Sequence, residues 1–452
     1  MTDATMPAVQ PPAEPDGAAR VAVLDILRGI AILGILFMNI NDMGGSIHVL
    51  FGGDFRHFGW GVADQIVWWL REVLANGTAR CLLEMLFGVG MVILTDRGAA
   101  SLGKWQVLRA YWWRNIVLFL FGLAHVWILL WPGDILHTYG LAALVAVLFR
   151  NFRVRWLLII GLSLAMLQLV GAGIGVEMAN RQHAGLAAVA AKQAAGQPIT
   201  TAESNTLVEY NKSATAGAKR RAETAARVAA EDKTRTGDGR SWAQAAWDAW
   251  LFIQVRGLEL LFVWEAAGTM LIGAALYKLG IIQGARSRRF YANLVIVAYA
   301  IGLGFRVWGT WGMTRFDHLI RFPDAAQEVS RLATTLGHVA LVNWLVLTVV
   351  GARLLRPFEA AGKTALSVYI AQTLICLWVL YPPWGLALYG DQSWWQFMVT
   401  ALAINAVLLI GANWWVRYYA IAPVEWAWRS IVAGKRLPFR PLERSTSAVA
   451  EA

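Results

Sequence analysis

The amino-acid sequence predicts an all-α polytopic membrane protein, a bundle of about ten transmembrane helices with a helical insertion on its outer side. The chain has 452 residues, of which 58% are hydrophobic and only 15% are charged. Several separate apolar runs reach about 18 residues or more, the length that a helix needs to cross a bilayer. Many of the 24 tryptophans stand at the ends of these runs, where an interfacial aromatic belt is expected.

The apolar runs give ten expected spans. The tail before the first run is rich in Ala and Pro and has no signal-peptide cleavage site, so we expect the first span to be retained. The segment 60–76 is amphipathic and is expected at the membrane interface. Pro132 and Gly133 force a tight turn before the short fourth span. The spans are expected near residues 22–42, 78–96, 111–131, 135–149, 156–176, 256–280, 290–312, 333–352, 364–385 and 395–417.

Residues 177–245 differ in composition from the rest of the chain. They are rich in Ala, carry charges of both signs and contain few large apolar residues, which predicts a solvent-exposed helical insertion with a break near Gly196 and Pro198. The insertion divides the bundle into two expected halves of five spans, residues 21–176 and 246–430, without a convincing internal repeat. A disordered tail is expected at residues 1–20 and a basic tail at residues 431–452.

Lys and Arg side chains are concentrated in alternate short loops and in the C-terminal tail. Because cations are retained on the cytoplasmic side, this asymmetry predicts that both termini are cytoplasmic and that the protein is a multi-pass protein of the cell inner membrane. The net charge of +11 is explained by this topology signal. We therefore expect the lipid bilayer, and no nucleic acid, as the partner of these cations.

The first span contains polar side chains that a lipid-facing helix would exclude. Asp25 and Arg28 are three residues apart and share a helix face, and Asn39 aligns with Arg28 about 16 Å further along the axis. A charge near the bilayer centre costs roughly 2.5–3.5 kcal/mol, so this stripe must face protein or water. Arg28 is suited to bind a phosphate or carboxylate. The alternative is an intrahelical Asp25–Arg28 pair that only neutralises both charges.

Two histidines toward the outer side are candidate general bases. His48 follows the first span in a Gly-rich segment, and it is either a base for a hydroxyl or amine acceptor or a surface residue without a role. His125 precedes Trp131 by six residues, which places it about 9 Å below the outer interface. It is either a general base or a hydrogen-bonded core residue. Asp134 follows in a turn, where it can orient a histidine or cap the next helix.

The remaining intramembrane polar residues suggest one passage. Glu265 lies within the sixth span and needs a partner or a proton. Lys363 enters the ninth span from the inner side. Together with the residues above, they predict a single continuous polar cavity that opens outward and narrows to a cationic inner end. Cys81 and Cys376 lie in apolar stretches, so no metal site is expected, and no Walker or Rossmann motif occurs.

Four blocks of the chain resemble a known family. They are Arg20 with Leu24–Gly29, Ala31, Gly34 and Asn39; His125 with Trp131 and Gly133–Leu136 through Tyr139–Gly140; Gly362–Ser367 with Tyr369 and Gln372; and Pro423 with Glu425–Trp426 and Trp428–Arg429. This combination resembles the YeiB family, whose domain is one of unknown function (number 418), over most of the chain outside the tail and the insertion. Tyr139, Gln372 and Glu425 of these blocks join the residues introduced above as candidates for substrate binding. The full candidate set is Asp25, Arg28, Tyr139, Glu265, Lys363, Gln372 and Glu425.

The Leu-Arg-Gly opening is also similar to that of transmembrane acyltransferases. In the polysaccharide O-acyltransferases a histidine stands at the place that Asn39 takes here. Heparan glucosaminide N-acetyltransferase has an asparagine there, followed by glycines and a histidine, which Asn39, Gly44, Gly45 and His48 match loosely. The similarity implies an acyl group that passes from acyl-coenzyme A inside to an acceptor outside.

The sequence thus predicts an inner-membrane acyltransferase that uses cytoplasmic acyl-coenzyme A and an extracytoplasmic acceptor such as an envelope glycan or a small molecule. Its expected catalytic residues are His48, His125, Asp134 and Asn39. A transporter or exporter of a small anionic solute is the competing hypothesis, because the same charges would line a substrate pathway. A membrane scaffold without turnover is the third.

Overall fold

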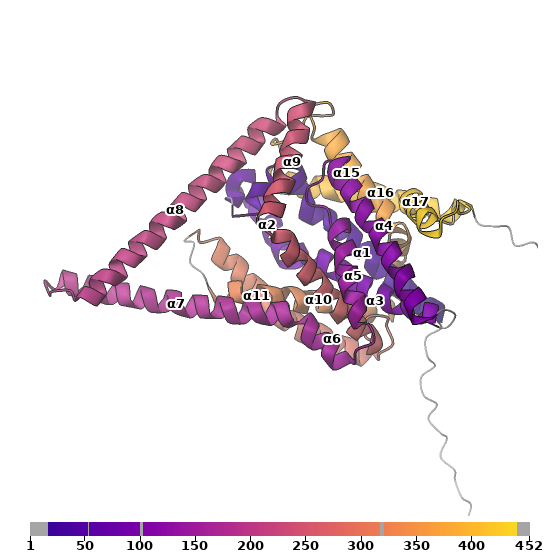
Figure 1. The fold of residues 1–452 in the computed structure, drawn as a ribbon, viewed down its shortest axis with the longest axis horizontal. Coiled ribbons are helices and arrows are strands. Elements are labelled where there is room, and N and C mark those ends of the chain that lie inside the picture. Colours follow the sequence, from indigo (N-terminus) through magenta and orange to yellow (C-terminus); the bar gives the residue numbers. More distant parts are fainter. Residues whose placement is uncertain (1–16, 53, 100–102, 317–320, 441–452) are drawn as a thin grey trace, which may run out of the picture.

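The computed structural model describes residues 17–52, 54–99, 103–316 and 321–440. In these ranges all regular elements are helical, as the sequence predicts. The helices form one bundle, from which a long helix projects and a second long helix returns, so that the two enclose a triangular frame with the bundle (Figure 1). The ends of both expected tails, residues 1–16 and 441–452, lie outside the described residues.

Among the described residues, six helices are long and apolar enough to cross a membrane, or seven if a bent pair forms one span. The prediction of ten spans exceeds this number. Two of the additional expected spans fall on the short apolar helices Leu136–Phe149 and Ala365–Leu380, and a third falls on α4 (Lys104–Trp127), whose first turns carry three cations. The long helices are Ala22–Gly44, Val62–Gly98, Val154–Ala194, Leu258–Lys278, Arg288–Met313 and Trp394–Tyr418, and the bent pair is Gln327–Val346 with Val349–Lys363.

Helix α1 (Gly17–Gly44) lies at the centre of the bundle, and most of its side chains from Val23 onward are buried. Helix α10 (Leu258–Lys278) packs against α3, α5 and α6. The helices that pack on α1 are α3 (Thr78–Ala99), α14 (Val349–Lys363), α15 (Ala365–Leu374) and α16 (Trp394–Tyr418).

The contact between α1 and α14 is close because glycines face the opposite backbone. A Cβ atom on Gly29 would lie 1.9 Å from the carbonyl oxygen of Phe358, and one on Gly362 would lie 1.8 Å from the carbonyl oxygen of Asp25. Small residues allow such backbone approach in membrane bundles. The glycines of the first and third sequence blocks therefore hold these two helices together.

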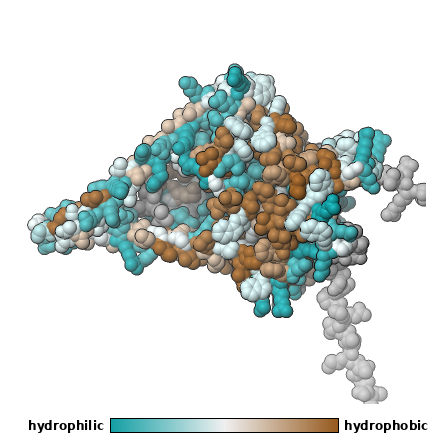
Figure 2. Space-filling view, in the orientation of Figure 1, coloured by the Kyte–Doolittle hydropathy of each residue, from teal (hydrophilic) through white to brown (hydrophobic). Residues whose placement is uncertain are grey.

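The projecting frame contains the expected insertion. Helix α7 (Ser163–Ala194) follows α6 (Val154–Gly161) and extends beyond the bundle, α8 (Thr201–Arg235) returns, and α9 (Gly239–Val255) leads back into the bundle (Figure 1). The surface along α8 is largely hydrophilic, whereas the bundle shows broad hydrophobic areas (Figure 2). Helix α8 thus has a water-compatible surface and the bundle a lipid-compatible one.

Short and irregular helices connect these elements. The amphipathic segment expected at residues 60–76 forms α2 (Val62–Leu70) and the π-helix η3 (Arg71–Ala75), which lead into α3 as part of one long apolar stretch. Such π-helical turns are rare and occur frequently at functional sites. The other elements are η1 (Ile47–Val49), η2 (Phe55–Phe58), α5 (Leu136–Ala146), η4 (Val147–Phe149), α11 (Arg288–Met313), α12 (Phe322–Ala325), α13 (Gln327–Val346), η5 (Ile375–Leu380) and α17 (Pro423–Ala433).

Candidate functional site

A first cavity of about 840 Å³ lies where α1 begins and α3 ends. Its described lining contains five cationic side chains and only two carboxylates, Asp25 and Glu425, and we call it the cationic cavity. Its deeper wall is apolar, with Leu83, Leu86 and Phe87 from α3. The cations are Arg28, Arg97, Arg114, Lys363 and Arg429.

The first-span pair predicted from the sequence is present in this cavity. Arg28 Nη1 lies 2.6 Å from Asp25 Oδ1, and both residues line the cavity, with the Arg28 side chain still 37% exposed. Lys363 forms a similar pair with Glu359 on its own helix, at 2.6 Å. Both cations therefore remain accessible to a ligand although each has a carboxylate partner.

Glu425 joins two sequence blocks at the edge of the cationic cavity. Its Oε1 accepts hydrogen bonds from the backbone N–H groups of Leu366 at 2.7 Å and Ser367 at 3.2 Å, and its Oε2 accepts one from the Ser367 hydroxyl at 2.5 Å. These N–H groups belong to the first turn of α15, which attracts anions. Glu425 thus fixes the start of α15 beside Lys363.

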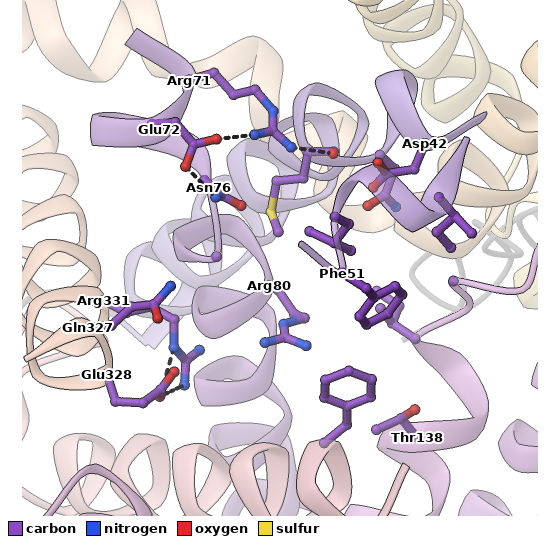
Figure 3. A pocket seen from close by; sticks show the side chains of 18 of the residues that line it. Asp42, Phe51, Arg71, Glu72, Asn76, Arg80, Thr138, Gln327, Glu328 and Arg331 are labelled. Carbon is purple, nitrogen blue, oxygen red and sulfur yellow. Dashed lines mark hydrogen bonds and ion pairs between the residues drawn. The ribbon is translucent and has the colours of Figure 1, made fainter. Parts of the chain in front are cut away.

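A second cavity of about 580 Å³ lies at the opposite ends of α1 and α3 (Figure 3). Seven carboxylates and four arginines line it among the described residues, and we call it the carboxylate cavity. Asn39 and Tyr139 belong to its wall, as does the aromatic ring of Trp131. The carboxylates are Asp42, Glu72, Glu84, Asp134, Glu259, Asp324 and Glu328, and the arginines are Arg71, Arg80, Arg306 and Arg331.

The two cavities meet at a thin partition. Ile135 and Tyr139 line both of them, and the Tyr139 hydroxyl donates a hydrogen bond to the carbonyl oxygen of Arg80 at 3.1 Å. The expected passage therefore consists of two cavities that share these two residues. A buried aromatic side chain separates two chambers of different charge.

A buried carboxylate beside the partition binds two imidazoles. Asp134 Oδ1 lies 2.6 Å from His125 Nδ1, and Asp134 Oδ2 lies 2.9 Å from His137 Nδ1. Oδ2 also accepts the backbone N–H of His137 at 2.9 Å, so Asp134 caps α5 as well. Burial alone would raise the pKa of Asp134, but the two histidines outweigh it and hold that pKa well below its usual range.

The two imidazoles differ in access. The side chain of His125 is fully buried, its Nε2 lies 2.9 Å from the Thr373 hydroxyl, and it lines neither cavity. His137 lines the carboxylate cavity, and its Nε2 lies 3.2 Å from Glu259 Oε2. Sequence reasoning did not select His137, although its spacing of three residues from Asp134 was a usable signal.

Glu265 has the partners that its position in a span requires. Its Oε1 lies 2.5 Å from Arg80 Nη2 and 2.9 Å from Arg331 Nη2. Arg331 also contacts Glu328 at 2.7 Å and Glu84 at 3.4 Å. The tertiary fold thus gathers these charges in a buried network at the wall of the carboxylate cavity.

The other predicted residues have structural surroundings of their own. His48 does not line the carboxylate cavity; its ring packs edge-on against Phe252 at 4.8 Å, and burial lowers its pKa. Gln372 is buried and donates hydrogen bonds to Asn405 Oδ1 at 3.0 Å and to the carbonyl oxygen of Ile32 at 3.2 Å, which connects helices. The structure thus brings together two sets of predicted residues, with Tyr139 lining both cavities. The cationic cavity contains Asp25, Arg28, Lys363 and Glu425, and the carboxylate cavity contains Asn39 and Asp134. The predicted residues outside both linings are His48, His125, Glu265 and Gln372.

Comparison with known sequences identifies the relatives of this chain. The family described as "Protein of unknown function (DUF418)" matches residues 276–435. YxaH of Bacillus subtilis (strain 168) is 27% identical over 94% of this chain and 97% of its own length, and YeiB of Escherichia coli (strain K12) is 28% identical over 91% and 96%. Residues 276–435 of the chain are therefore a DUF418 segment, and the chain is similar to both relatives over most of its length. No solved structure matches it.

The apolar helices of the described residues make the chain a multi-pass membrane protein. Both of these bacterial relatives are described as uncharacterized. The matched range extends from the end of α10 through α17. It includes Lys363, Ser367 and Glu425, which meet at the cationic cavity. The DUF418 segment therefore builds one part of the wall of that cavity, and α1, α3, α4 and α5 supply the rest.

Proposed function

We propose that this protein is a membrane acyltransferase that takes an acyl group from acyl-coenzyme A in the cationic cavity and transfers it to an acceptor in the carboxylate cavity. The observation that carries the proposal is the shared partition: the two cavities meet at Ile135 and Tyr139, beside the imidazoles bound to Asp134. The similarity of the first sequence block to transmembrane acyltransferases also supports a function in acyl transfer.

The cationic cavity has the properties that a coenzyme A thioester requires. Its five cations complement phosphate groups, for which guanidinium groups are especially suited. Its volume lies within the range of small-molecule sites, and its apolar α3 wall fits the pantetheine arm and an acyl chain. From the loop charges we expect this cavity, with both termini, on the cytoplasmic side.

The transfer step uses one nucleophile and one base. A hydroxyl oxygen of the acceptor attacks the thioester carbonyl carbon; the new C–O bond forms, the C–S bond breaks, and the product is an ester. We assign His137 as the base in its neutral form: once Glu259 has taken the proton of their contact, Nε2 takes the hydroxyl proton and passes it to the departing thiolate. Asp134 holds His137 at Nδ1, and His125 positions Asp134 from behind.

The first experiment measures donor binding. Purified protein in lipid nanodiscs is titrated with acetyl-coenzyme A, and Arg28→Ala is expected to weaken binding by about tenfold or more, because a charged hydrogen bond contributes roughly 1.5–3 kcal/mol. Arg181→Ala is the matched control, since Arg181 lies on the exposed α7 and pairs only with Glu177 among the described residues. A wild-type protein that does not bind the thioester overturns the proposal.

The second experiment looks for the product. Envelope glycans and metabolites of a deletion strain are compared after complementation with wild type, His137→Ala or His125→Ala. Wild type is expected to restore an acyl mark that His137→Ala does not restore. A deletion strain with an unchanged acyl profile argues against transfer.

A transporter of a small anionic solute is the second candidate function. It is favoured by the broken helices around the cavities: α13 and α14 bend by 117° at their junction, and α5 and α15 are short. Discontinuous helices of this kind form the substrate sites of many transporters. Accumulation of unmodified solute in proteoliposomes, without consumption of a thioester, would support transport over transfer.

A further inference from the structure

Asp42 differs from the other charged residues of the carboxylate cavity. It lies near the end of α1, it is only 5% exposed, and it belongs to the cavity wall. Its Oδ1 accepts a hydrogen bond from Nδ2 of the adjacent Asn41 at 2.6 Å. Among the described residues, no Lys, Arg or His forms an ion pair with it.

The nearest cation is occupied by other groups. Arg71 donates hydrogen bonds to the carbonyl oxygens of Phe37 at 3.1 Å and Met38 at 2.9 Å, and it pairs with the neighbouring Glu72. Its charge acts on Asp42 only from a greater distance. In the view of Figure 3, Asp42 lies away from Arg331, and the side chain of Arg80 stands between them.

The other carboxylates of this cavity have partners in the described structure. Asp134 and Glu259 contact His137, and Glu84 and Glu328 contact Arg331. Asp324 accepts the backbone N–H of Arg321 at 2.7 Å. Asp42 is therefore the lining carboxylate with no cationic or backbone partner among the described residues.

A buried carboxylate without a partner is costly, so it requires either a proton or a cation. The cavity also has more carboxylates than arginines along its wall. We infer that the carboxylate cavity binds its ligand through a protonated amino group held at Asp42.

The rest of the wall indicates an amino sugar as the ligand class. The cavity volume of about 580 Å³ fits a sugar-sized group, and the wall combines the rings of Phe51 and Trp131 with the amide of Asn39. This inference rests on the proposed function, because the ligand is then the acceptor. Its amine is the anchor at Asp42, and one of its hydroxyl groups is the nucleophile near His137.

The test compares three probes of nearly the same shape. Glucosamine carries the amine, glucose replaces it by a hydroxyl, and N-acetylglucosamine removes its charge. Binding to the purified full-length protein in nanodiscs is measured by calorimetry or ligand-observed NMR at about pH 6, without acyl-coenzyme A. Wild type is expected to prefer glucosamine over both other sugars by about tenfold or more.

Two variants test whether Asp42 is the residue that causes the preference for glucosamine. Asp42→Asn keeps the shape and removes the charge, and it is expected to reduce the preference to about twofold or less. Asp64→Asn is the matched control: Asp64 is equally buried but lies outside the cavity lining, where it accepts the backbone N–H groups of Gly61 and Trp395. It is expected to leave the preference intact.

The outcomes are distinct from those of the donor experiment. Absence of an amine preference in wild type overturns the inference even if Asp42→Asn does not fold. A preference that persists in a folded Asp42→Asn protein also overturns it, since Asp42 then holds only a proton. If glucosamine binds through Asp42 but the thioester does not bind, the amine site stands and the transferase is rejected; the reverse pattern retains the transferase and rejects the amine site.

Discussion

The hydroxyl of Tyr139 donates a hydrogen bond to the carbonyl oxygen of Arg80 at 3.1 Å, and this contact holds an aromatic ring between two cavities. Tyr139 is 1% exposed, so its ring is buried where the two cavities meet. On one side of this ring, the cavity that contains Arg28 has more cations than carboxylates; on the other side, the cavity that contains Asp42 has more carboxylates than arginines.

Replacing Tyr139 by Ala is expected to join the two cavities. Removal of a buried aromatic ring costs about 3–5 kcal/mol and leaves a void. In proteoliposomes, Tyr139→Ala is expected to leak a small hydrophilic dye that wild type retains. Tyr139→Phe loses only the hydrogen bond, about 0.5–1.5 kcal/mol, and is expected to remain sealed. A Tyr139→Ala protein that is folded and does not leak would show that other residues close the passage.

Replacing Asp134 by Ala is expected to destabilise the protein by about 3–5 kcal/mol, because two buried imidazoles lose their shared acceptor. Thermal unfolding in detergent measures this loss. Glu177→Ala removes an exposed carboxylate on α7 and is expected to change stability by less than about 0.5 kcal/mol. Equal unfolding temperatures for the Asp134 variant and wild type would contradict a structural role for the network.

The glycine contact between α1 and α14 predicts a pair of opposite effects. Gly362→Ala places a methyl group 1.8 Å from the Asp25 carbonyl oxygen, so the helices must separate at a cost of about 1–3 kcal/mol or more. Gly411→Ala on α16 meets open space and is expected to be neutral or to stabilise the helix by up to about 1 kcal/mol. Thermal unfolding of both variants gives the comparison, and similar losses at the two positions would rule out the close contact.

The attachment of α8 to the bundle is expected to depend on pH. His57 Nε2 lies 3.0 Å from Asp232 Oδ2 near the end of α8, and Tyr389 donates a hydrogen bond to Asp232 Oδ1 at 2.9 Å. The hydrogen bond to Asp232 raises the pKa of His57 above its ordinary value of 6.5, against the opposing effect of burial, with further help from the charges of Asp232 and Asp54. A raised histidine pKa means that the docked state binds the proton more tightly.

The contact between His57 and Asp232 is expected to be more stable at acidic pH. The contribution of His57 is complete below pH 6.5 and is lost as the pH rises through its raised pKa in the docked state. Hydrogen exchange at the C-terminal turns of α8 is therefore expected to be slower at acidic pH after correction for intrinsic rates. His57→Gln is expected to remove the difference. A wild-type profile that is flat across this range would contradict the prediction.

Much of the fold could be predicted from hydropathy, because lipid requires helices whose backbone groups are satisfied internally. The helical bundle, the helical insertion and the polar stripe with Asp25, Arg28 and Asn39 are examples. The number of membrane spans was predicted less accurately than the helical fold. Short helices such as α5 and α15 are apolar because neighbouring helices bury them, and composition alone does not distinguish this burial from contact with lipid.

In the candidate site, too, local relationships could be predicted from the sequence, whereas contacts between distant helices could not. Spacing along one helix is a local property, so the sequence by itself determined that Asp25, Arg28 and Asn39 lie on one face of the first helix. Only the tertiary structure decided that His137 and not His125 reaches a cavity, that Arg331 pairs with Glu265, and that Tyr139 divides the interior. These relationships join helices that are distant in the chain, and they arise from packing, which no local pattern encodes.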